Sequence, residues 1–342
     1  MDVDTSDWTI PEAWTRIETI DAHTGGEPLR IVVDGLPPLE GETILDKRRY
    51  MQRELDDYRQ ALMYEPRGHA DMYGAVLTDP DDERADLGVL FTHNEGYSTM
   101  CGHGIVALGT VLPETGLYDA STIRIETPAG LITATVNRDG DRVESVAFEN
   151  VPSFVYARDR AVDVPGLGRV EYDVAFGGAF YAYVSAADVG VGLGTDDAAD
   201  LVDAGRAIKA AVADDLEIEH PHEDDLSFLY GTIFTGDPAA GSDADSRNVC
   251  VFADGEVDRC PTGTGVSGRL ALRADDGRLD PGERFTVESI VGSTFTGWYD
   301  ETATYGGYDA VVPTVRGSAH VTGSHTFVLD PDDPFQTGFF LR

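Results

Sequence analysis

Two short segments have the residues and spacing to do chemistry: a cysteine and a threonine that each precede glycines and an expected helix. Cys101-Gly102-His103-Gly104 leads into the apolar run Ile105–Leu108, and Thr262-Gly263-Thr264-Gly265 leads into Val266. A helix N-terminus offers unpaired backbone N–H groups and a partial positive charge, and glycines let a ligand approach that backbone closely. If the two helix starts face each other, they form one pocket that suits a carboxylate.

Cys101 is the residue best placed to react. A free thiol has a pKa of about 8.5, and a helix N-terminus lowers it, by about one unit from the helix dipole alone. We therefore expect a thiolate at Cys101 that acts as a proton abstractor or a nucleophile. Plainer interpretations stay open: a buried, inert cysteine, or structural helix starts that bind nothing. Phosphate binding is disfavoured because neither segment carries the lysine of a P-loop or a complete dinucleotide fingerprint.

The elements that must position these segments occur twice in the chain. Three pairs of segments match in the same order: Gly25-Gly26 with Gly177-Gly178, Phe91–Gly104 with Phe252–Gly265, and Glu126–Gly130 with Glu288–Gly292. Each match is weak alone, but their shared order makes chance a poor explanation. We therefore predict an α/β (α+β) protein built from two copies of one unit that face each other, each with several short strands around one central helix.

Local patterns give the expected elements. Strands are expected where β-branched residues alternate between turn residues, at 31–33, 123–125, 131–136 and 285–287. Helices are expected from residue 105 to a point before Pro113, at 266–273, and at 198–213, the last amphipathic and peripheral. Exposed loops are expected at 217–225 and 236–245. Proline marks expected strand ends or edges at Pro128, Pro152 and Pro313.

The composition is strongly acidic. The 342 residues include 25 Lys and Arg against 62 Asp and Glu, for a formal net charge of −37, and the only lysines are Lys47 and Lys209. Such a field repels nucleic acid and anionic membranes, so neither is an expected partner. The acidic residues are spread along the chain and lysine is scarce, which favours a halophilic protein, adapted to high salt, over a merely acidic mesophilic one.

The length suits two domains of ordinary size. No apolar run of about 18 residues suggests a transmembrane helix, and the acidic N-terminus lacks the features of a secretory signal. The three cysteines are sparse and odd in number, which does not suggest a disulfide framework. A reducing, cytoplasmic location is therefore expected.

Five motifs together resemble the proline racemase family, over a stretch from about Thr19 to Phe335. The motifs are His23–Pro28, Arg67–His69, Met100–Gly104, Gly177–Tyr181 and Asp258–Gly265. The resemblance implies a diaminopimelate epimerase-like fold of two pseudo-symmetric subdomains, each a barrel-like sheet around a central helix. It places residues 1–137 and 319–342 in an N-terminal subdomain carrying Cys101, and residues 138–318 in a C-terminal subdomain carrying Asp258 and Thr262. The active site is then expected in the cleft between them.

In racemases of this family, two cysteines flank the α-carbon of the substrate. Cys101 matches the first position, whereas Thr262 occupies the second. A threonine hydroxyl stays protonated and is a poor acid–base group, so proton exchange on both faces should fail while one-base chemistry remains. The Cys/Thr pair resembles the trans-3-hydroxy-L-proline dehydratase subgroup. There, abstraction of the α-proton by Cys101 is followed by loss of the 3-hydroxyl as water, giving Δ1-pyrroline-2-carboxylate.

The same resemblance assigns substrate-binding residues. Four backbone N–H groups are expected to hold the substrate carboxylate, those of Gly102, His103, Gly263 and Thr264. Asp258 and His103 are expected to contact the ring nitrogen, and Phe252 to form an apolar wall. No cofactor or metal is expected, since carboxylate binding in a dry pocket stabilises the carbanion. Relatives also suggest a homodimer.

The sequence is compatible with two other functions. The protein could be a proline racemase or 4-hydroxyproline 2-epimerase despite Thr262, or a catalytically silent amino-acid-binding protein of the same fold. Asp258 is also open to interpretation as only a cap at the entry to the second helix.

The remaining cysteines and histidines have plainer expectations. Cys260 is a conceivable second acid–base group, but Pro261 fixes the local backbone, and packing is favoured for it as for Cys250. His220 and His222 are expected in an exposed loop rather than a zinc site. Four further histidines are expected to be structural: His23, His69, His93 and His325.

Overall fold

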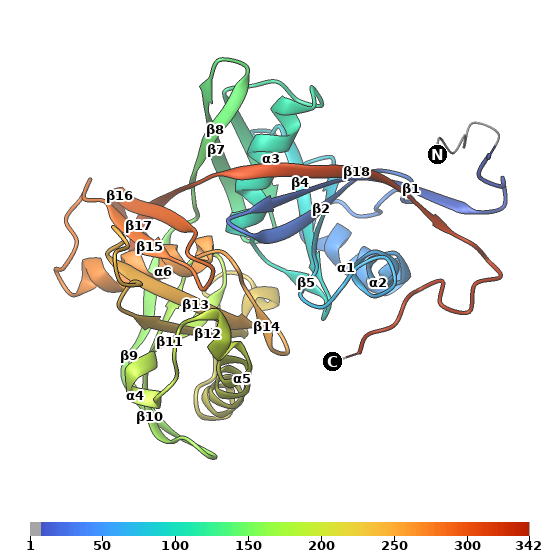
Figure 1. The fold of residues 1–342 in the computed structure, drawn as a ribbon. Coiled ribbons are helices and arrows are strands. Elements are labelled where there is room, and N and C mark those ends of the chain that lie inside the picture. The colour runs from blue at the N-terminus through green and yellow to red at the C-terminus, as the bar shows by residue number, and fades with distance from the viewer. Residues whose placement is uncertain (1–7, 342) are drawn as a thin grey trace.

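The computed structural model describes residues 8–341 and shows two similar α/β halves whose sheets run into one another (Figure 1). The first half contains β1 (Thr15–Thr24), β2 (Glu27–Asp34), β3 (Tyr73–Thr78), β4 (Leu87–His93), β5 (Tyr97–Ser98), β6 (Thr122–Thr127), β7 (Gly130–Asp139) and β8 (Arg142–Glu149). Its helices are α1 (Ile44–Glu54), α2 (Asp56–Met63) and α3 (Gly102–Glu114).

The second half repeats the order of strands and helix. Its strands are β9 (Ser153–Val164), β10 (Gly168–Phe176), β11 (Phe180–Ser185), β12 (Leu229–Gly236), β13 (Ser246–Phe252), β14 (Glu256–Val257), β15 (Phe285–Glu288), β16 (Thr294–Tyr305) and β17 (Tyr308–Gly317). Its helices are α4 (Ala186–Val189), α5 (Ala198–Asp215) and α6 (Gly263–Asp275), with short 3-10 turns at Thr195–Asp197 and Asp224–Leu226.

Strand pairing confirms the repeat found in the sequence. In the first half β2 runs parallel to β3, β3 antiparallel to β4, and β4 parallel to β6. In the second half β11 and β12, β12 and β13, and β13 and β15 pair in the same three ways. Each half curls its sheet around one helix, α3 or α6. The expected α/β class and the two pseudo-symmetric halves are thereby confirmed.

Long strands join the halves. β17 pairs with both β8 and β9, and the last strand, β18 (Ala319–Leu329), returns to pair with β1. In Figure 1, β18 lies along the first half beside β1. Because β8 pairs with β7 as well as β17, the strands near the junction are shared by both halves. The subdomain boundaries expected at residues 137 and 318 stay a prediction.

The two central helices are buried along most of their length, and α3 is apolar on nearly every side. Every residue of α3 from Gly102 to Pro113 is buried, as is most of α6, which is the pattern of a helix enclosed by a core rather than lying on it. The expectation that the first helix stops before Pro113 is wrong by two residues. Pro113 lies in the last turn, where losing one backbone N–H does not end the helix, and Thr115 N–H closes it on the Val111 carbonyl.

The strand and proline expectations hold with one correction. All four predicted strand segments lie in strands, Pro128 separates β6 from β7, and Pro152 precedes β9. Pro313, however, lies inside β17, opposite Tyr299 where the register with β16 shifts at a bulge. Proline has no N–H to donate to a ladder, and a bulge tolerates it inside a strand.

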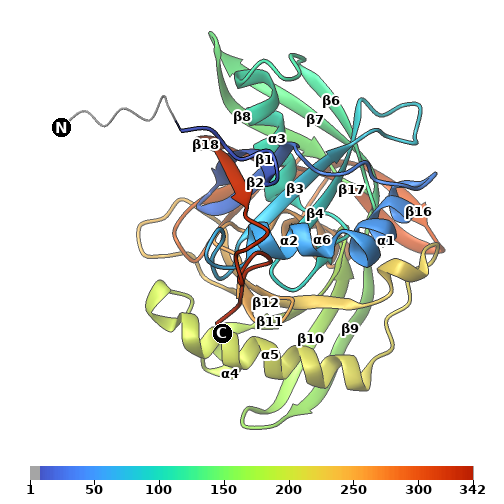
Figure 2. The same ribbon diagram turned by 90° about the vertical axis from the view of Figure 1, so that its right-hand side faces the viewer.

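The third predicted helix is α5, which contacts β12 and β13 and covers the outside of the second half (Figure 2). Among the described residues, no helix is long and apolar enough to cross a membrane. The loop expected to be exposed at 217–225 is only partly so, because Ile218 and His220 are buried. The His220 ring lies 5.0 Å from that of Phe176, which explains its burial.

Candidate active site

The starts of α3 and α6 meet and enclose a small pocket between the halves. All eight residues assigned from the sequence line it: Cys101, Gly102, His103, Phe252, Asp258, Thr262, Gly263 and Thr264. Four further residues complete the lining: Tyr73, Met100, Tyr181 and Tyr230. The space that remains is about 20 Å³, roughly the room that one water molecule needs. The structure is therefore a closed arrangement.

Glycine at the first position of each helix permits this closure. A Cβ atom added to Gly102 would lie 2.6 Å from the Gly263 Cα, and one added to Gly263 would lie 2.8 Å from the Gly102 Cα. Separations under about 3 Å are far inside van der Waals contact. The two helix N-termini thus touch backbone to backbone, and the first N–H groups of both, which have no partner within their own helix, are gathered at one place.

Cys101 is the N-cap of α3. Its backbone is extended, and its Sγ accepts a hydrogen bond from the Gly104 N–H at 3.2 Å. The same sulfur lies 3.2 Å from His103 Nδ1. The side chain is buried, with 4% of its surface exposed. The helix start therefore holds the sulfur in place through a direct N–H contact, as the sequence suggested.

The expectation that Cys101 has a low pKa is wrong for this closed arrangement. Burial raises the pKa of the Cys101 thiol well above its ordinary value, and the nearby carboxyl groups of Asp258 and Glu27 raise it further. The Gly104 N–H and the Tyr73 hydroxyl lower it, but not enough. Desolvation disfavours a thiolate more strongly than the helix start favours it. The protein by itself thus holds Cys101 as a thiol.

Thr262 occupies the matching position of α6 with a different backbone. Its φ is 64° and its ψ is 96°, a conformation that is a genuine outlier for a β-branched residue and costs about 1–3 kcal/mol. Its hydroxyl does not cap the helix but donates to Asp258 Oδ2 at 2.7 Å. The two helix starts are therefore unequal, with a sulfur that accepts a helix N–H on one side and a hydroxyl bound to a carboxylate on the other.

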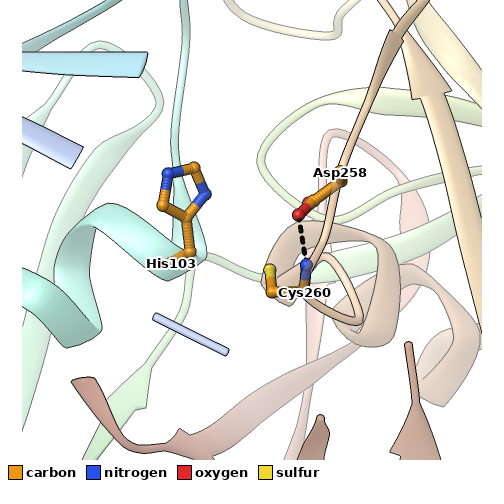
Figure 3. A group of neighbouring side chains, drawn as sticks. All are labelled: His103, Asp258 and Cys260. Atoms are coloured by element: carbon orange, nitrogen blue, oxygen red, sulfur yellow. Dashed lines mark hydrogen bonds between the residues drawn. The ribbon is translucent and has the colours of Figure 1, made fainter. Parts of the chain in front are cut away.

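Asp258 holds the loop between β14 and α6 together. One carboxylate oxygen accepts from Thr262 Oγ1, and the other accepts from the Cys260 N–H at 2.8 Å. Thr262, rather than Asp258, is the N-cap residue of α6, so Asp258 is not merely the cap of this helix. His103 projects from α3 toward the same place (Figure 3). Burial lowers the pKa of His103 to about 4, so its imidazole is neutral near pH 7.

Aromatic rings close the side of the pocket. Phe252 stacks on Tyr230 with centroids 5.4 Å apart and meets Tyr73 edge-on at 6.1 Å. The Tyr73 and Tyr230 hydroxyls lie 3.3 Å apart. On the α6 side, Tyr181 Oη and Thr264 Oγ1 are hydrogen-bonded at 2.8 Å. The expected apolar wall at Phe252 is thus one ring of a larger aromatic group.

Sequence reasoning missed the tyrosines of this lining. Tyr181 is the last residue of the family motif Gly177–Tyr181, but the resemblance did not assign it to substrate binding. Tyr73 and Tyr230 lie at the starts of β3 and β12, which are equivalent strands of the two halves. Extending the repeat through these strands would have paired them. Met100, which directly precedes Cys101 in the motif Met100–Gly104, was likewise not assigned to the site.

Polar contacts bridge the halves around the pocket. Arg259 N–H donates to Glu27 Oε2 at 2.7 Å, and Arg259 Nη2 lies 3.0 Å from Asp71 Oδ2. His93 Nδ1 lies 3.3 Å from Glu256 Oε2. Glu27 is fully buried, and desolvation together with Asp258 raises its carboxyl pKa well above the ordinary value. None of these contacts was predicted from the sequence.

The remaining cysteines and histidines lie outside the residues that line the pocket. Cys250 and Cys260 are fully buried, and the Cys260 sulfur accepts from the Thr262 N–H at 3.3 Å. Among the described residues, the groups with metal-ligand spacing do not include His220 or His222. The four histidines expected to be structural do not line the pocket: His23, His69, His93 and His325. His23, for example, accepts the Gly26 N–H in the β1–β2 turn.

Known proteins are similar to this chain in fold and in sequence. The model of the family described as proline racemase matches residues 19–340. A trans-3-hydroxy-L-proline dehydratase from Homo sapiens is 48% identical over 335 residues, covering 95% of each chain. One from Colwellia psychrerythraea is 46% identical over 335 residues, covering 97% of this chain and 94% of its own. A crystal structure of a hydroxyproline epimerase from Agrobacterium vitis, with bound trans-4-hydroxy-L-proline, has a TM-score of 0.89 at 30% identity and 96% coverage of both chains.

The two paired α/β halves have the fold of the hydroxyproline epimerase from Agrobacterium vitis. Within that fold class the chain belongs to the proline racemase family.

Proposed function

We propose that this protein is a trans-3-hydroxy-L-proline dehydratase that uses Cys101 as its base and no cofactor. The observation that carries the proposal is the unequal pair of helix starts, with a thiol on one side and a hydroxyl bound to Asp258 on the other. Relatives nearly half identical over almost the whole chain carry the dehydratase name. A pocket with one competent acid–base group supports elimination over racemisation.

Substrate binding prepares the first step. The N–H groups of Gly102, His103, Gly263 and Thr264 hold the carboxylate, and Asp258 with His103 faces the ring nitrogen. The positive ring nitrogen offsets the carboxylates that raise the pKa of Cys101, so the Cys101 thiol releases its proton to the solvent as the substrate binds, and the thiolate forms. The thiolate then takes the α-proton, and the amide donors stabilise the charge that moves onto the carboxylate.

The stereochemistry of the substrate lets the same sulfur complete the elimination. In trans-3-hydroxy-L-proline the hydroxyl is trans to the carboxylate, so it lies on the same ring face as the α-hydrogen. The C3–O bond breaks as the C2–C3 double bond forms, and the Cys101 thiol returns its proton to the leaving oxygen to give water. The ring nitrogen of the enamine still carries two protons; it loses one of them while C3 gains a proton, giving Δ1-pyrroline-2-carboxylate with a protonated imine nitrogen. Thr262, on the opposite face, holds Asp258 rather than moving protons.

The decisive experiment compares three substrates. Trans-3-hydroxy-L-proline, trans-4-hydroxy-L-proline and L-proline are incubated separately with the protein in D₂O at high salt and followed by proton NMR. The proposal expects water loss from the first and little α-proton exchange in the others. Efficient racemisation of proline or epimerisation of 4-hydroxyproline would favour the alternative that the epimerase neighbour and its ligand suggest, and binding without turnover would favour a silent amino-acid-binding protein. The homodimer, the cytoplasmic location and the salt requirement stay predictions.

The activity should rise with pH. The raised pKa of Cys101 means that little thiolate exists in the free protein near neutrality, and kcat/KM reports the free enzyme. We expect log kcat/KM to increase with a slope of about one as the pH rises above neutrality, because the fraction of thiolate grows tenfold per pH unit below the pKa. Initial rates of water loss across this range test it, with the thermal transition recorded at each pH as a control for unfolding. A flat profile across neutrality would show that the thiol is already ionised.

Substituting Thr262 by cysteine should add chemistry on the second ring face. In Thr262→Cys a thiol faces Cys101 across the ring, so L-proline should exchange its α-proton and form D-proline at least about 10²-fold faster than with wild type. Chiral chromatography and deuterium incorporation measure this. Thr110→Cys is the matched control, because Thr110 is a buried threonine of α3 that bonds its own helix at the Val106 carbonyl. Equal racemisation by both variants would contradict the prediction that residue 262 faces Cys101 across the substrate ring.

A further inference from the structure

Three metal-ligating side chains gather beside the pocket: His103, Asp258 and Cys260 (Figure 3). Each offers one ligand atom, a ring nitrogen, a carboxylate oxygen and a sulfur, and these atoms all lie within 4.8 Å of one another. All three residues are buried, with Cys260 fully so. His103 comes from the first half, at the start of α3, whereas Asp258 and Cys260 come from the loop before α6 in the second half. The cluster therefore exists only where the halves meet.

The spacing and ligand types suit a thiophilic divalent cation. Zinc binds nitrogen at about 2.0 Å and sulfur at about 2.3 Å in tetrahedral sites, which puts its ligand atoms about 3.3–3.8 Å apart. The three ligand atoms lie within 4.8 Å of one another, so binding requires them to move closer together by up to about 1 Å. One soft sulfur, one imidazole and one carboxylate form a set that zinc and cadmium bind and that hard cations such as magnesium do not prefer.

The surroundings of His103 also suit a cation here. A hydrogen bond from His103 to the Pro28 carbonyl occupies one ring nitrogen, as the outer partner of a metal-bound histidine usually does.

We propose that His103, Asp258 and Cys260 form a binding site for a zinc-like divalent cation, and that occupation of this site excludes the substrate. The exclusion rests on the proposed function, in which His103 and Asp258 face the ring nitrogen of the substrate. Cys260 is the residue that makes the site selective for soft cations, because a serine hydroxyl there would be a weak ligand. The strongly negative protein, at −37, concentrates cations around it.

The first experiment measures metal binding and does not depend on an activity assay. Cd²⁺ is titrated into the protein, and the sulfur-to-cadmium charge-transfer absorbance in the ultraviolet is recorded. We expect one equivalent to bind to wild type with this band, and the band to be lost in Cys260→Ser. Cys250→Ser is the matched control, because Cys250 is another fully buried cysteine of the same half outside the three-residue cluster; it should bind as wild type does. Retention of the band in Cys260→Ser, or no band in wild type, would overturn the proposal.

Inhibition is tested second. Zn²⁺ should raise the KM of wild type for trans-3-hydroxy-L-proline without lowering kcat, and a chelator should reverse the effect. In Cys260→Ser, whose activity without metal should be unchanged, at least about tenfold more Zn²⁺ should be needed. Equal inhibition of both proteins would overturn the site. If wild type binds Cd²⁺ through Cys260 but does not dehydrate hydroxyproline, the metal site stands and the proposed reaction fails, so the two failures are distinguishable.

Discussion

Replacing Cys101 by serine is expected to lower kcat for water loss from trans-3-hydroxy-L-proline by about 10³–10⁴-fold. A positioned general base contributes about 10²–10⁴-fold, and in the proposed reaction Cys101 serves twice, taking the α-proton and returning it to the leaving hydroxyl. A serine hydroxyl has no accessible anion near neutrality and does neither. Single-turnover and steady-state rates measured by NMR or by chromatography of the cyclic imine check this result.

Binding and folding should survive the same substitution. The backbone N–H groups that hold the carboxylate do not depend on the sulfur, so the affinity of Cys101→Ser for substrate, measured by calorimetry, should stay within about fivefold of wild type. Cys250→Ser serves again as the buried-cysteine control and should keep nearly full activity. A Cys101→Ser variant with more than about a tenth of wild-type turnover would rule out Cys101 as the base.

Adding one methyl group at Gly102 is expected to be almost as damaging. In Gly102→Ala the new Cβ would lie 2.6 Å from the Gly263 Cα and 3.0 Å from Phe148 Cζ. Backbone at Gly263 cannot rotate away as a side-chain tip can, so the two helix starts must separate. A displacement of about 1 Å in a catalytic arrangement costs about 10²-fold in rate, and we expect kcat/KM to fall by at least that factor.

A second glycine gives the control for this prediction. In Gly323→Ala the added Cβ meets only the imidazole of His325, at 3.2 Å from Nε2, on the partly exposed strand β18. That variant should keep wild-type kcat/KM. If Gly102→Ala also keeps it, the close approach of the two helices is not needed for the chemistry, and the closed pocket would have to be reconsidered.

Much of the fold could be predicted because the duplication leaves a record in the sequence. The repeated glycine-rich starts and the turn glycines locate α3, α6 and the strands around them, and the β-branched alternation locates individual strands. The errors fall where tertiary contacts override local patterns. Pro313 lies inside a strand because a bulge in β16 accommodates it, and His220 is buried because the ring of Phe176 covers it.

The candidate site was predictable in part of its membership but not in its electrostatics. All eight assigned residues line one pocket, seven of them because the motifs around Cys101 and Thr262 contain them, whereas the four other lining residues were not predicted. The raised pKa of Cys101 was not predictable, since it arises from burial and from Glu27 and Asp258, which are distant in sequence. The left-handed backbone of Thr262 was likewise invisible, because nothing local to a threonine favours a φ of 64°.

The near absence of free space between the helix starts has a kinetic consequence. A five-membered ring with a carboxylate is far larger than a cavity of about 20 Å³, so every catalytic cycle includes one parting of the halves to admit the amino acid and another to discharge the imine. Arg259 of the second half contacts Glu27 and Asp71 of the first half and so opposes this parting. We expect the opening to limit turnover, so that added viscogen slows the reaction.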